Sequence, residues 1–323
     1  MYEVNINNSQ NKSIYMLYED RVDDNLFQFN SVLNSNISES FDFDIGINYK
    51  NLNSVNFANS LDLLGGSFYI DVDSYRQGDE SQNNLNQPDR IIKENEPFKY
   101  NYEINSESVN IFSNLELRKS KLSLTVTPKF SYYTIQRDGK YRNGVYPENS
   151  FGESEKKEFL NGSVKTNLEY KFTGRHVLRL SSAYITRPPT IRNSFSNSRE
   201  NNEFVEGIGD ENIYSSEATY FMNIKPIKLK ITGYFSRFHN MNEISFFFAQ
   251  GLSGLEESSD FVSEIMTGSS REHYGLEFGA ESQITPTIKL TGAVALGEYV
   301  YTNNPTLFLT SDDIRGYADY GTT

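Results

Sequence analysis

The chain has no cysteine, which excludes disulfide bonds and thiolate chemistry. It has no apolar run approaching the ~20 residues that a transmembrane helix requires. Its start, Met1, Tyr2 and Glu3, lacks the basic residues and the apolar core of a secretory signal. If the protein is exported, we therefore expect a longer precursor. The formal net charge of −13 argues against a nucleic-acid backbone as a partner.

Hydrophobic residues are also few for a chain of 323 residues. They make up 37% of the sequence, and the mean hydropathy is −0.58. Aromatic residues nevertheless reach 14%, with 22 Tyr and 23 Phe. A large globular core would need more aliphatic residues, whereas many aromatics on a polar background suit strands that are half exposed to an apolar surrounding.

The segment 164–189 shows the unit that the rest of the chain repeats. Apolar and polar residues alternate from Val164 to Tyr170, which places one set on each face of a β-strand. A short turn follows, with Gly174 available for a positive φ. The chain climbs again to Tyr184 and stops at Pro188 and Pro189, which have no amide to donate to a ladder. The next segment, 190–212, is polar and has no clear period.

The same unit recurs from one end of the chain to the other. We expect about ten strands in five hairpins, near 12–36, 41–50, 100–117, 122–132, 164–170, 178–184, 213–224, 229–248, 274–283 and 288–301. Every second connection is short, and the others are long and polar. Strands of ten or more residues exceed the ~5–6 of soluble sheets and match tilted strands that cross a ~30 Å hydrocarbon layer. The pattern predicts an all-β fold, an antiparallel up-and-down transmembrane β-barrel wall. A soluble β-sandwich has the same alternation and is the alternative.

A barrel wall also predicts which residues face lipid and which connections lie outside the cell. The lipid-facing set is Phe43, Ile45, Val126, Leu168 and Leu276, and the lumen-facing set is Asp44, Thr125, Lys165 and Glu277. The turns at Lys119, Thr173, Pro226 and Pro286 are predicted to be periplasmic, and the loops near Asn84, Asn149, Asn202 and Leu255 extracellular. The chain is expected to end in a polar segment without a closing strand.

We find no arrangement of residues that predicts an enzyme, a cofactor or a metal site. His176, His239 and His273 are far apart and lack metal-ligand spacing. Asp71, Asp73 and Asp79 lack the ligand order and the glycine of a calcium loop, so a solvated acidic loop is expected there, as at Asp312 and Asp313. Glu277 and Glu281 would lie roughly 13 Å apart on one strand face. That distance is too long for a retaining glycosidase pair, and lumen-facing wall charges are expected instead.

Phe246, Phe247 and Phe248 are the candidate ligand-binding residues, at the upper rim of the wall. Aromatic residues at that height are typical of an interfacial girdle. The same residues would also suit a stacking platform for a sugar or an aromatic ligand. The girdle is the simpler interpretation.

Several stretches resemble the TonB-dependent receptors of the Gram-negative outer membrane. They are "FTGRHVLRLSSAYITRPPTIRNSF" (172–195), "GIGDENIYSSEATYF" (207–221), "EISFFFAQG" (243–251) and "REHYGLEFGAESQITPTIKLTGAVALGEYVYTNNP" (271–305). The segment from Tyr184 to Thr190 matches the family's strand end "Y.TRPPT", which makes Arg187, Pro188 and Pro189 structural motif residues. Asp210 to Glu217 departs from the family's "NP.L.PE" segment, because it has no proline and only Glu217 aligns.

The resemblance implies a 22-stranded barrel around an N-terminal plug, of which residues 1–323 would form about ten strands of wall. The nearest likeness is to the large receptors with an N-terminal carboxypeptidase-regulatory-like domain. Neither a plug, nor a TonB box, nor the terminal strand is found in the sequence. The implied partners are outer-membrane lipid, the TonB complex acting through the missing plug, and a surface lipoprotein.

The leading functional hypothesis is active uptake of a scarce nutrient, such as a siderophore, a glycan or a peptide, across the outer membrane of a Gram-negative bacterium. Two alternatives come from other classes. One is a soluble or surface-attached β-sandwich binding module, and the other is a passive ten-stranded pore that closes on itself.

Overall fold

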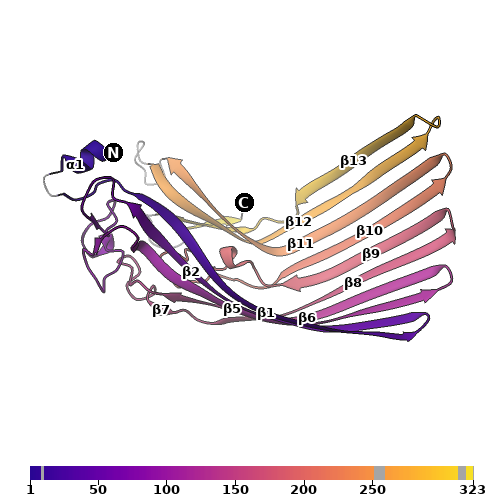
Figure 1. Ribbon diagram of the computed structural model, residues 1–323, viewed down its shortest axis with the longest axis horizontal. Helices are drawn as coiled ribbons and strands as arrows, with labels where there is room; N and C mark the ends of the chain where they lie inside the picture. The colour runs from indigo at the N-terminus through magenta and orange to yellow at the C-terminus, as the bar shows by residue number, and fades with distance from the viewer. Residues whose placement is uncertain (9–10, 251–258, 312–317, 323) are drawn as a thin grey trace.

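The computed structural model describes residues 1–8, 11–250, 259–311 and 318–322 (Figure 1). Ten strands of 12 to 25 residues make up most of the chain. They are β1 (Leu17–Ser38), β2 (Phe41–Asp62), β5 (Pro97–Lys119), β6 (Leu122–Gly139), β8 (Lys157–Thr173), β9 (His176–Arg187), β10 (Glu211–Ile224), β11 (Ile227–Gln250), β12 (Ser259–Gln283) and β13 (Lys289–Tyr301). The short elements are α1 (Tyr2–Ile6), β3 (Tyr69–Ile70), η1 (Gly78–Ser81), β4 (Ile91–Ile92), β7 (Gly152–Glu153), η2 (Ile191–Asn193), β14 (Thr306–Ser311) and β15 (Ala318–Thr322).

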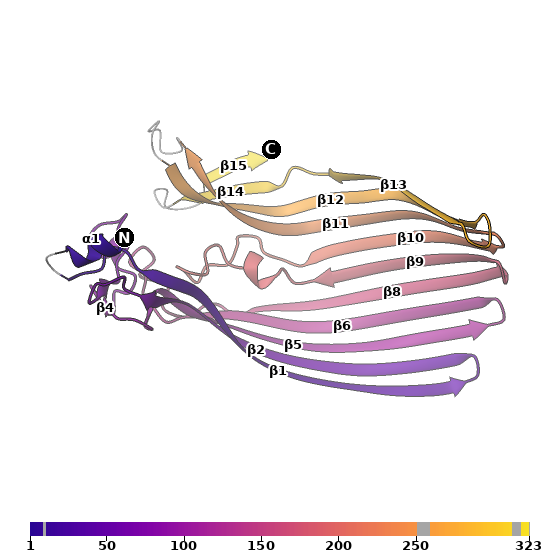
Figure 2. The same cartoon turned by 45° about the horizontal axis from the view of Figure 1, so that its top comes forward.

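The long strands pair as five hairpins in one antiparallel sheet, in the order β1-β2-β5-β6-β8-β9-β10-β11-β12, with β13 and β14 both on β12. The predicted all-β, up-and-down wall of ten strands is therefore confirmed. Figure 2 shows the short turns gathered at one end of the sheet and the long connections at the other. The turn at Gly174 forms without a positive φ, so its glycine is not required for the backbone geometry there.

The strand register turns the alternation of the sequence into two continuous faces. Opposed residues in an antiparallel pair share a face, and one row of such pairs runs through Phe41, Leu117, Leu124, Leu168, Leu180, Ala218, Gly233, Leu276 and Leu296. The neighbouring row on the other face runs through Asp42, Glu116, Thr125, Asn167, Ser181, Glu217 and Tyr234. The predicted lipid-facing and lumen-facing sets thus fall on opposite faces of one sheet.

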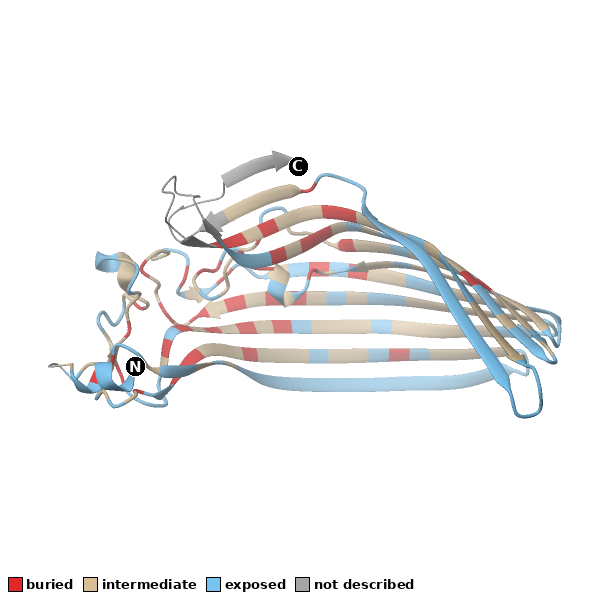
Figure 3. Cartoon of the chain, turned by 90° about the horizontal axis from the view of Figure 1, so that it is seen from above, coloured by how far each residue is buried: buried red, intermediate tan, exposed pale blue. Residues whose placement is uncertain are grey.

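The sheet curves into an open trough, with η2 lying in its hollow (Figures 1 and 3). Buried side chains collect at the end of the trough with the long connections (Figure 3). A core of Ala58, Ile92, Phe98, Tyr100, Tyr102, Ile104, Ile135, Phe159 and Phe195 forms there, joining four long strands to two of the connections. Within the described part of the chain, no helix is both long and apolar enough to cross a membrane.

Several strands extend further upward than the alternation predicts. β2 continues to Asp62, β6 runs past the predicted end near residue 132 and includes Arg137, and β8 begins at Lys157 rather than at Val164. In these upper parts loops cover one face of the sheet, so the ladder continues under a sequence without a clean period of two.

The segment after Tyr301 contains two strands, β14 and β15, that the alternation does not predict. β14 pairs with the upper part of β12, β13 pairs with its lower part, and β15 pairs with β14. Between β13 and β14 the side chain of Asn303 forms hydrogen bonds with the backbone of β12. Its Oδ1 accepts from Ser270 N at 2.7 Å, and its Nδ2 donates to Gly268 O at 2.8 Å. The wall therefore continues past Tyr301. Leu255, Asp312 and Asp313 lie outside the described residues.

Candidate functional site

The connection between β9 and β10, residues 188–210, crosses the concave face of the sheet and is called here the bridging segment. Its two ends are held together at the "TRPP" motif, where Arg187 Nε donates to Glu211 Oε2 at 2.8 Å. The carboxylate of Glu211 is buried, so the ion pair fixes the point at which the segment leaves the sheet. Pro188 and Pro189 follow at once and end the ladder. The motif residues thus set the base of the bridging segment.

Arg137 on β6 binds the bridging segment to the sheet through hydrogen bonds from its side chain. Its side chain is 2% exposed, and its Nε donates to Ser198 O at 2.7 Å and its Nη1 to Ser150 O at 3.0 Å and to Asn202 Oδ1. The guanidinium lies 4.9 Å from the centre of the Tyr102 ring. Burial lowers the pKa of Arg137 to about 10, so the group remains charged at neutral pH. One buried cation therefore joins β6 to two separate connections.

Arg199 fastens the far side of the bridging segment to the first strand. Its Nη2 lies 3.0 Å from Asp20 Oδ2, and its guanidinium lies 4.7 Å from the centre of the Tyr100 ring. Tyr100 in turn donates its hydroxyl to Asp20 Oδ1 at 2.7 Å. Burial, followed by this hydrogen bond, raises the pKa of Tyr100. Arg199 and Asp20 are thus in contact although they lie 179 residues apart in the sequence.

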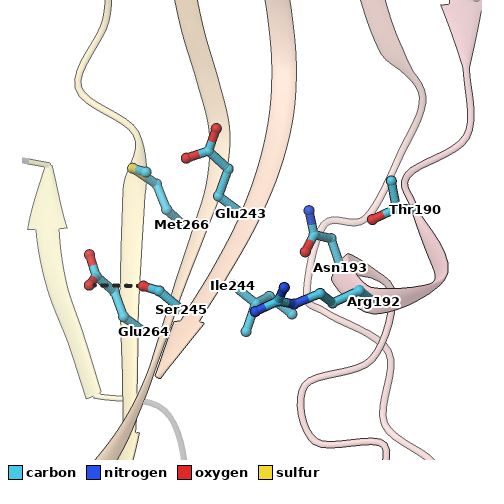
Figure 4. Close-up of a pocket in the computed structure, with 8 residues that line it drawn as sticks. All are labelled: Thr190, Arg192, Asn193, Glu243, Ile244, Ser245, Glu264 and Met266. Atoms are coloured by element: carbon cyan, nitrogen blue, oxygen red, sulfur yellow. Dashed lines mark hydrogen bonds between the residues drawn. The ribbon is translucent and has the colours of Figure 1, made fainter. Parts of the chain in front are cut away.

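On the opposite side the bridging segment meets β11, which rises here beyond the start of β10. Asn193 Nδ2 donates to Asn242 O at 2.7 Å. Between η2 and strands β11 and β12 the structure leaves an open cavity of about 360 Å³, called here the edge cavity (Figure 4). Its lining residues are Thr190, Arg192, Asn193, Glu243, Ile244, Ser245, Glu264 and Met266.

A second cavity, of about 530 Å³, lies between the bridging segment and the connection that follows β6. Its charged lining residues are Glu155, Lys157, Glu203 and Glu206. Lys157 is paired with Glu155 at 3.0 Å and lies 5.6 Å from the centre of the Phe204 ring. Burial, with the charge of Glu206, raises the pKa of Glu203. This cavity is acidic, in contrast to the mixed charges of the edge cavity.

The candidate residues Phe246, Phe247 and Phe248 lie near the upper end of β11, next to the edge cavity in sequence but not among its lining residues. All three side chains are exposed. Because successive residues of a strand point to opposite faces, Phe246 and Phe248 share a face with Ile244, while Phe247 shares the other with Ser245. The three rings therefore do not form one platform.

The structure brings together none of the other residues that were weighed for chemistry. Among the described residues, no three His, Cys, Asp or Glu side chains are grouped so that they could hold a metal ion. His176 meets the Tyr220 hydroxyl at 2.6 Å, and His239 meets Ser270 Oγ at 2.7 Å. Asp71 is the exception to the predicted solvated loop. It is buried, because Lys99 N, the Asn83 amide and Arg90 surround its carboxylate.

The residues that organise the site were missed by sequence reasoning. Arg137, Arg199 and Asp20 lie in three different parts of the chain, and their contacts follow no local period. The "TRPP" motif was the single sequence signal that pointed to this region, because it marks the base of the bridging segment.

Two solved structures share the fold. The copper transporter OprC matches with a TM-score of 0.61 and 11% identity, covering 90% of this chain and 41% of its own. The ferric-catecholate import receptor Fiu from E. coli K12, in its closed form, matches with a TM-score of 0.52 and 12% identity, covering 91% of this chain and 43% of its own. Over about nine tenths of its length the chain has the fold of part of these two proteins. It spans less than half the length of either protein.

No family model and no curated protein matches the sequence. The likeness to OprC, which is described as a transporter, and to Fiu, which is described as an import receptor, therefore concerns the fold. The predicted all-β fold of a partial barrel wall is confirmed. The type of N-terminal domain and the extent of the complete barrel stay predictions.

Proposed function

We propose that this chain forms part of the wall and mouth of a TonB-dependent receptor that takes up a scarce nutrient across the outer membrane. The observation that carries the proposal is the division of the sheet. Long strands with one continuous apolar face end in short turns on one side, and on the other side they end in connections that pack over the polar, concave face. That is the layout of an outer-membrane barrel with periplasmic turns and extracellular loops.

The open edges support a larger ring. In the described part, β1 pairs with β2 alone and β13 with β12 alone, and nearly every side chain of β1 and β13 is exposed. Unpaired strand edges cost several kcal/mol per group in hydrocarbon. We propose that further strands close the barrel around a plug, through which the TonB complex acts, and that a surface lipoprotein covers the mouth.

The two alternative functions have less support. A β-sandwich needs two packed sheets, whereas the long strands lie in one sheet. A passive pore needs the ten strands to close on themselves, and the edges formed by β1 and β13 do not pair with each other. OprC is described as a copper transporter and Fiu as a ferric-catecholate receptor, so the shared fold does not determine one substrate. Siderophore, glycan and peptide are therefore all kept as proposed substrate classes.

Single cysteines test the sidedness, because the chain has none of its own. We would place Tyr75→Cys and Phe151→Cys in the long connections, and Gly174→Cys and Thr287→Cys in the short turns, of the complete protein in its native membrane. Tyr75 is 94% exposed, and nothing lies within 4 Å of a side chain placed at Gly174. We expect a membrane-impermeant maleimide to label the first pair on intact cells and the second pair only after permeabilisation.

Labelling of the turn positions alone on intact cells would reverse the proposed orientation. Labelling of all four in a soluble fraction would contradict the membrane location. The uptake step is tested separately. Collapse of the proton-motive force should abolish accumulation of the nutrient while leaving its binding at the cell surface intact.

A further inference from the structure

We propose that the edge cavity binds a small zwitterion, either a free amino acid or a whole dipeptide with aliphatic side chains. Its carboxylate would meet Arg192 and its ammonium group would meet Glu264. The role of this site in uptake rests on the proposed function. The binding step does not, because it concerns the cavity alone.

The charges of the edge cavity leave one cation and one anion available. Arg192 has no ion pair or hydrogen bond to any residue that the structure describes. Glu243 is already paired with Arg271, at 3.0 Å between Oε1 and Nη1. Glu264 accepts only a hydroxyl, from Ser245 Oγ at 3.3 Å. After these pairings the cavity presents one guanidinium and one carboxylate.

These two groups line the same cavity without pairing with each other. Figure 4 shows Arg192 reaching from the bridging segment toward Ile244, while Glu264 lies beyond Ser245 on β12. An arginine and a glutamate in contact would form a charge-assisted pair. Their separation across the cavity instead leaves room for a ligand that carries both charges and meets each at its own end.

The rest of the lining favours a small aliphatic ligand. Met266 supplies apolar surface, and Ile244, which also lines the cavity, is almost fully buried against Val205 and Ile265. Thioether and branched aliphatic groups suit the alkyl side chain of an amino acid. A volume of about 360 Å³ lies at the lower end of the ~300–1,000 Å³ typical of small-molecule sites.

Other ligand classes fit less well. A phosphate or a multiply charged anion would require more than one free cation, and Arg192 is the one available in this cavity. A metal ion would require a group of three ligating side chains, which the described residues do not provide. A neutral sugar would not account for the two unpaired charges.

The test uses the intact receptor, purified in detergent, and calorimetric titration with leucyl-leucine. Two capped forms of the same dipeptide accompany it, one N-acetylated and one C-terminally amidated. Loss of one charge-assisted contact is expected to weaken binding by about tenfold. Each cap should have this effect on the wild-type receptor.

Two variants assign each end of the ligand to a residue. In Arg192→Gln, leucyl-leucine should bind about tenfold more weakly and the amidated form should no longer be discriminated. In Glu264→Gln, the same should hold for the acetylated form. Arg175→Gln and Glu39→Gln remove the same charges from exposed turns at the far end of the sheet, and they should leave all three affinities unchanged.

The capped peptides test the proposal on the wild-type protein, even if a variant fails to fold. Absence of saturable binding at millimolar leucyl-leucine would overturn it. Equal affinities for the capped and free peptides would also overturn it, as would discrimination that persists in both cavity variants. The cysteine labelling on cells can fail or succeed independently of this result, so the two proposals are separable.

Discussion

The two ends of the sheet are built from the same strands but are held in different ways. Near the short turns, which we call the lower wall, the structure is a single layer with one apolar and one polar face. Near the long connections, the upper wall, side chains from distant segments form a core and a network of buried polar contacts. The lower wall requires an apolar surrounding for its exposed leucines, whereas the upper wall supplies its own packing.

This difference explains how a chain with few aliphatic residues can still form a long, ordered sheet. Between paired strands the ladder hydrogen bonds satisfy the backbone, so burial is needed only where loops must be held in place. In the lower wall the surrounding lipid would take the place of a core. Substitutions that affect one region and spare the other therefore test whether the lower and upper walls are stabilised differently.

The largest effect is expected from a charge on the apolar face of the lower wall. Leu276→Arg should destabilise the folded barrel by ~2–4 kcal/mol if the residue faces the hydrocarbon near the midplane. The control is Glu277→Arg, one residue further along β12 and on the opposite face, which should cost little. Unfolding in urea from lipid vesicles, followed by the mobility of unheated samples, measures both. Equal costs for the two substitutions would contradict a wall with lipid on one side.

A smaller effect, confined to the upper wall, is expected for Arg137→Met. The substitution keeps an unbranched side chain beside Tyr102 but removes the donors to Ser198 O, Ser150 O and Asn202 Oδ1. A buried acceptor without a donor costs ~1–3 kcal/mol. Ser198 is only half-buried, and the substitution also removes the desolvation cost of a buried charge, so we expect about 2–3 kcal/mol in total for local opening. Hydrogen exchange in residues 140–156 and 188–210 should become about 30- to 100-fold faster.

The matched control for this prediction is Arg175→Met, which makes the same change in a turn of the lower wall. It should leave exchange in the upper wall unaltered. If Arg137→Met instead abolished the heat-modifiable form of the whole barrel, the two regions would be one cooperative unit and the comparison would fail.

The two regions also differ in how far the sequence predicts them. In the lower wall each residue's face follows from its position, so Phe41 to Lys50 and Val164 to Tyr170 predict strands from a period of two. In the upper wall the deciding contacts join residues such as Asp20 and Arg199, and no local pattern records such a pairing. Arg137 lies beyond the strand predicted near 122–132 for the same reason, because its partners, and not its neighbours in sequence, determine its environment.

The rim aromatics illustrate the same limit. Three consecutive rings, Phe246 to Phe248, suggest a platform when only the sequence is considered. A strand conformation sends Phe247 to the face opposite its neighbours, so the platform cannot form while β11 continues through them. A charged cavity beside them, lined by Arg192 and Glu264, had no sequence signature because its walls come from segments far apart in the chain.

The upper wall contains both a buried arginine, Arg137, and an exposed one, Arg199, and their contacts should differ in strength. Arg199→Ala removes a pair whose side chains are 49% and 44% exposed, so a cost of only ~0.2–1 kcal/mol is expected. Solvent screening should reduce it further as salt is raised from 50 to 500 mM. Hydrogen exchange of the bridging segment measures both effects. A cost equal to that of Arg137→Met would mean that solvent exposure does not determine how much each arginine stabilises the upper wall.

The smallest effect is expected from pH, in the connection that carries Asp71. Burial raises the pKa of this carboxyl, although the hydrogen bonds from Lys99 N and Asn83 and the charge of Arg90 act in the opposite direction. Between its ordinary pKa and the raised one, the folded segment holds a proton that the open segment has lost. Local stability should therefore fall as pH rises through that window and recover on acidification. Hydrogen exchange of residues 63–96, corrected for the intrinsic pH dependence of exchange, should show added protection as pH falls from 7 toward 4. Asp71→Asn should remove this dependence, and its persistence in the variant would assign the effect to another group.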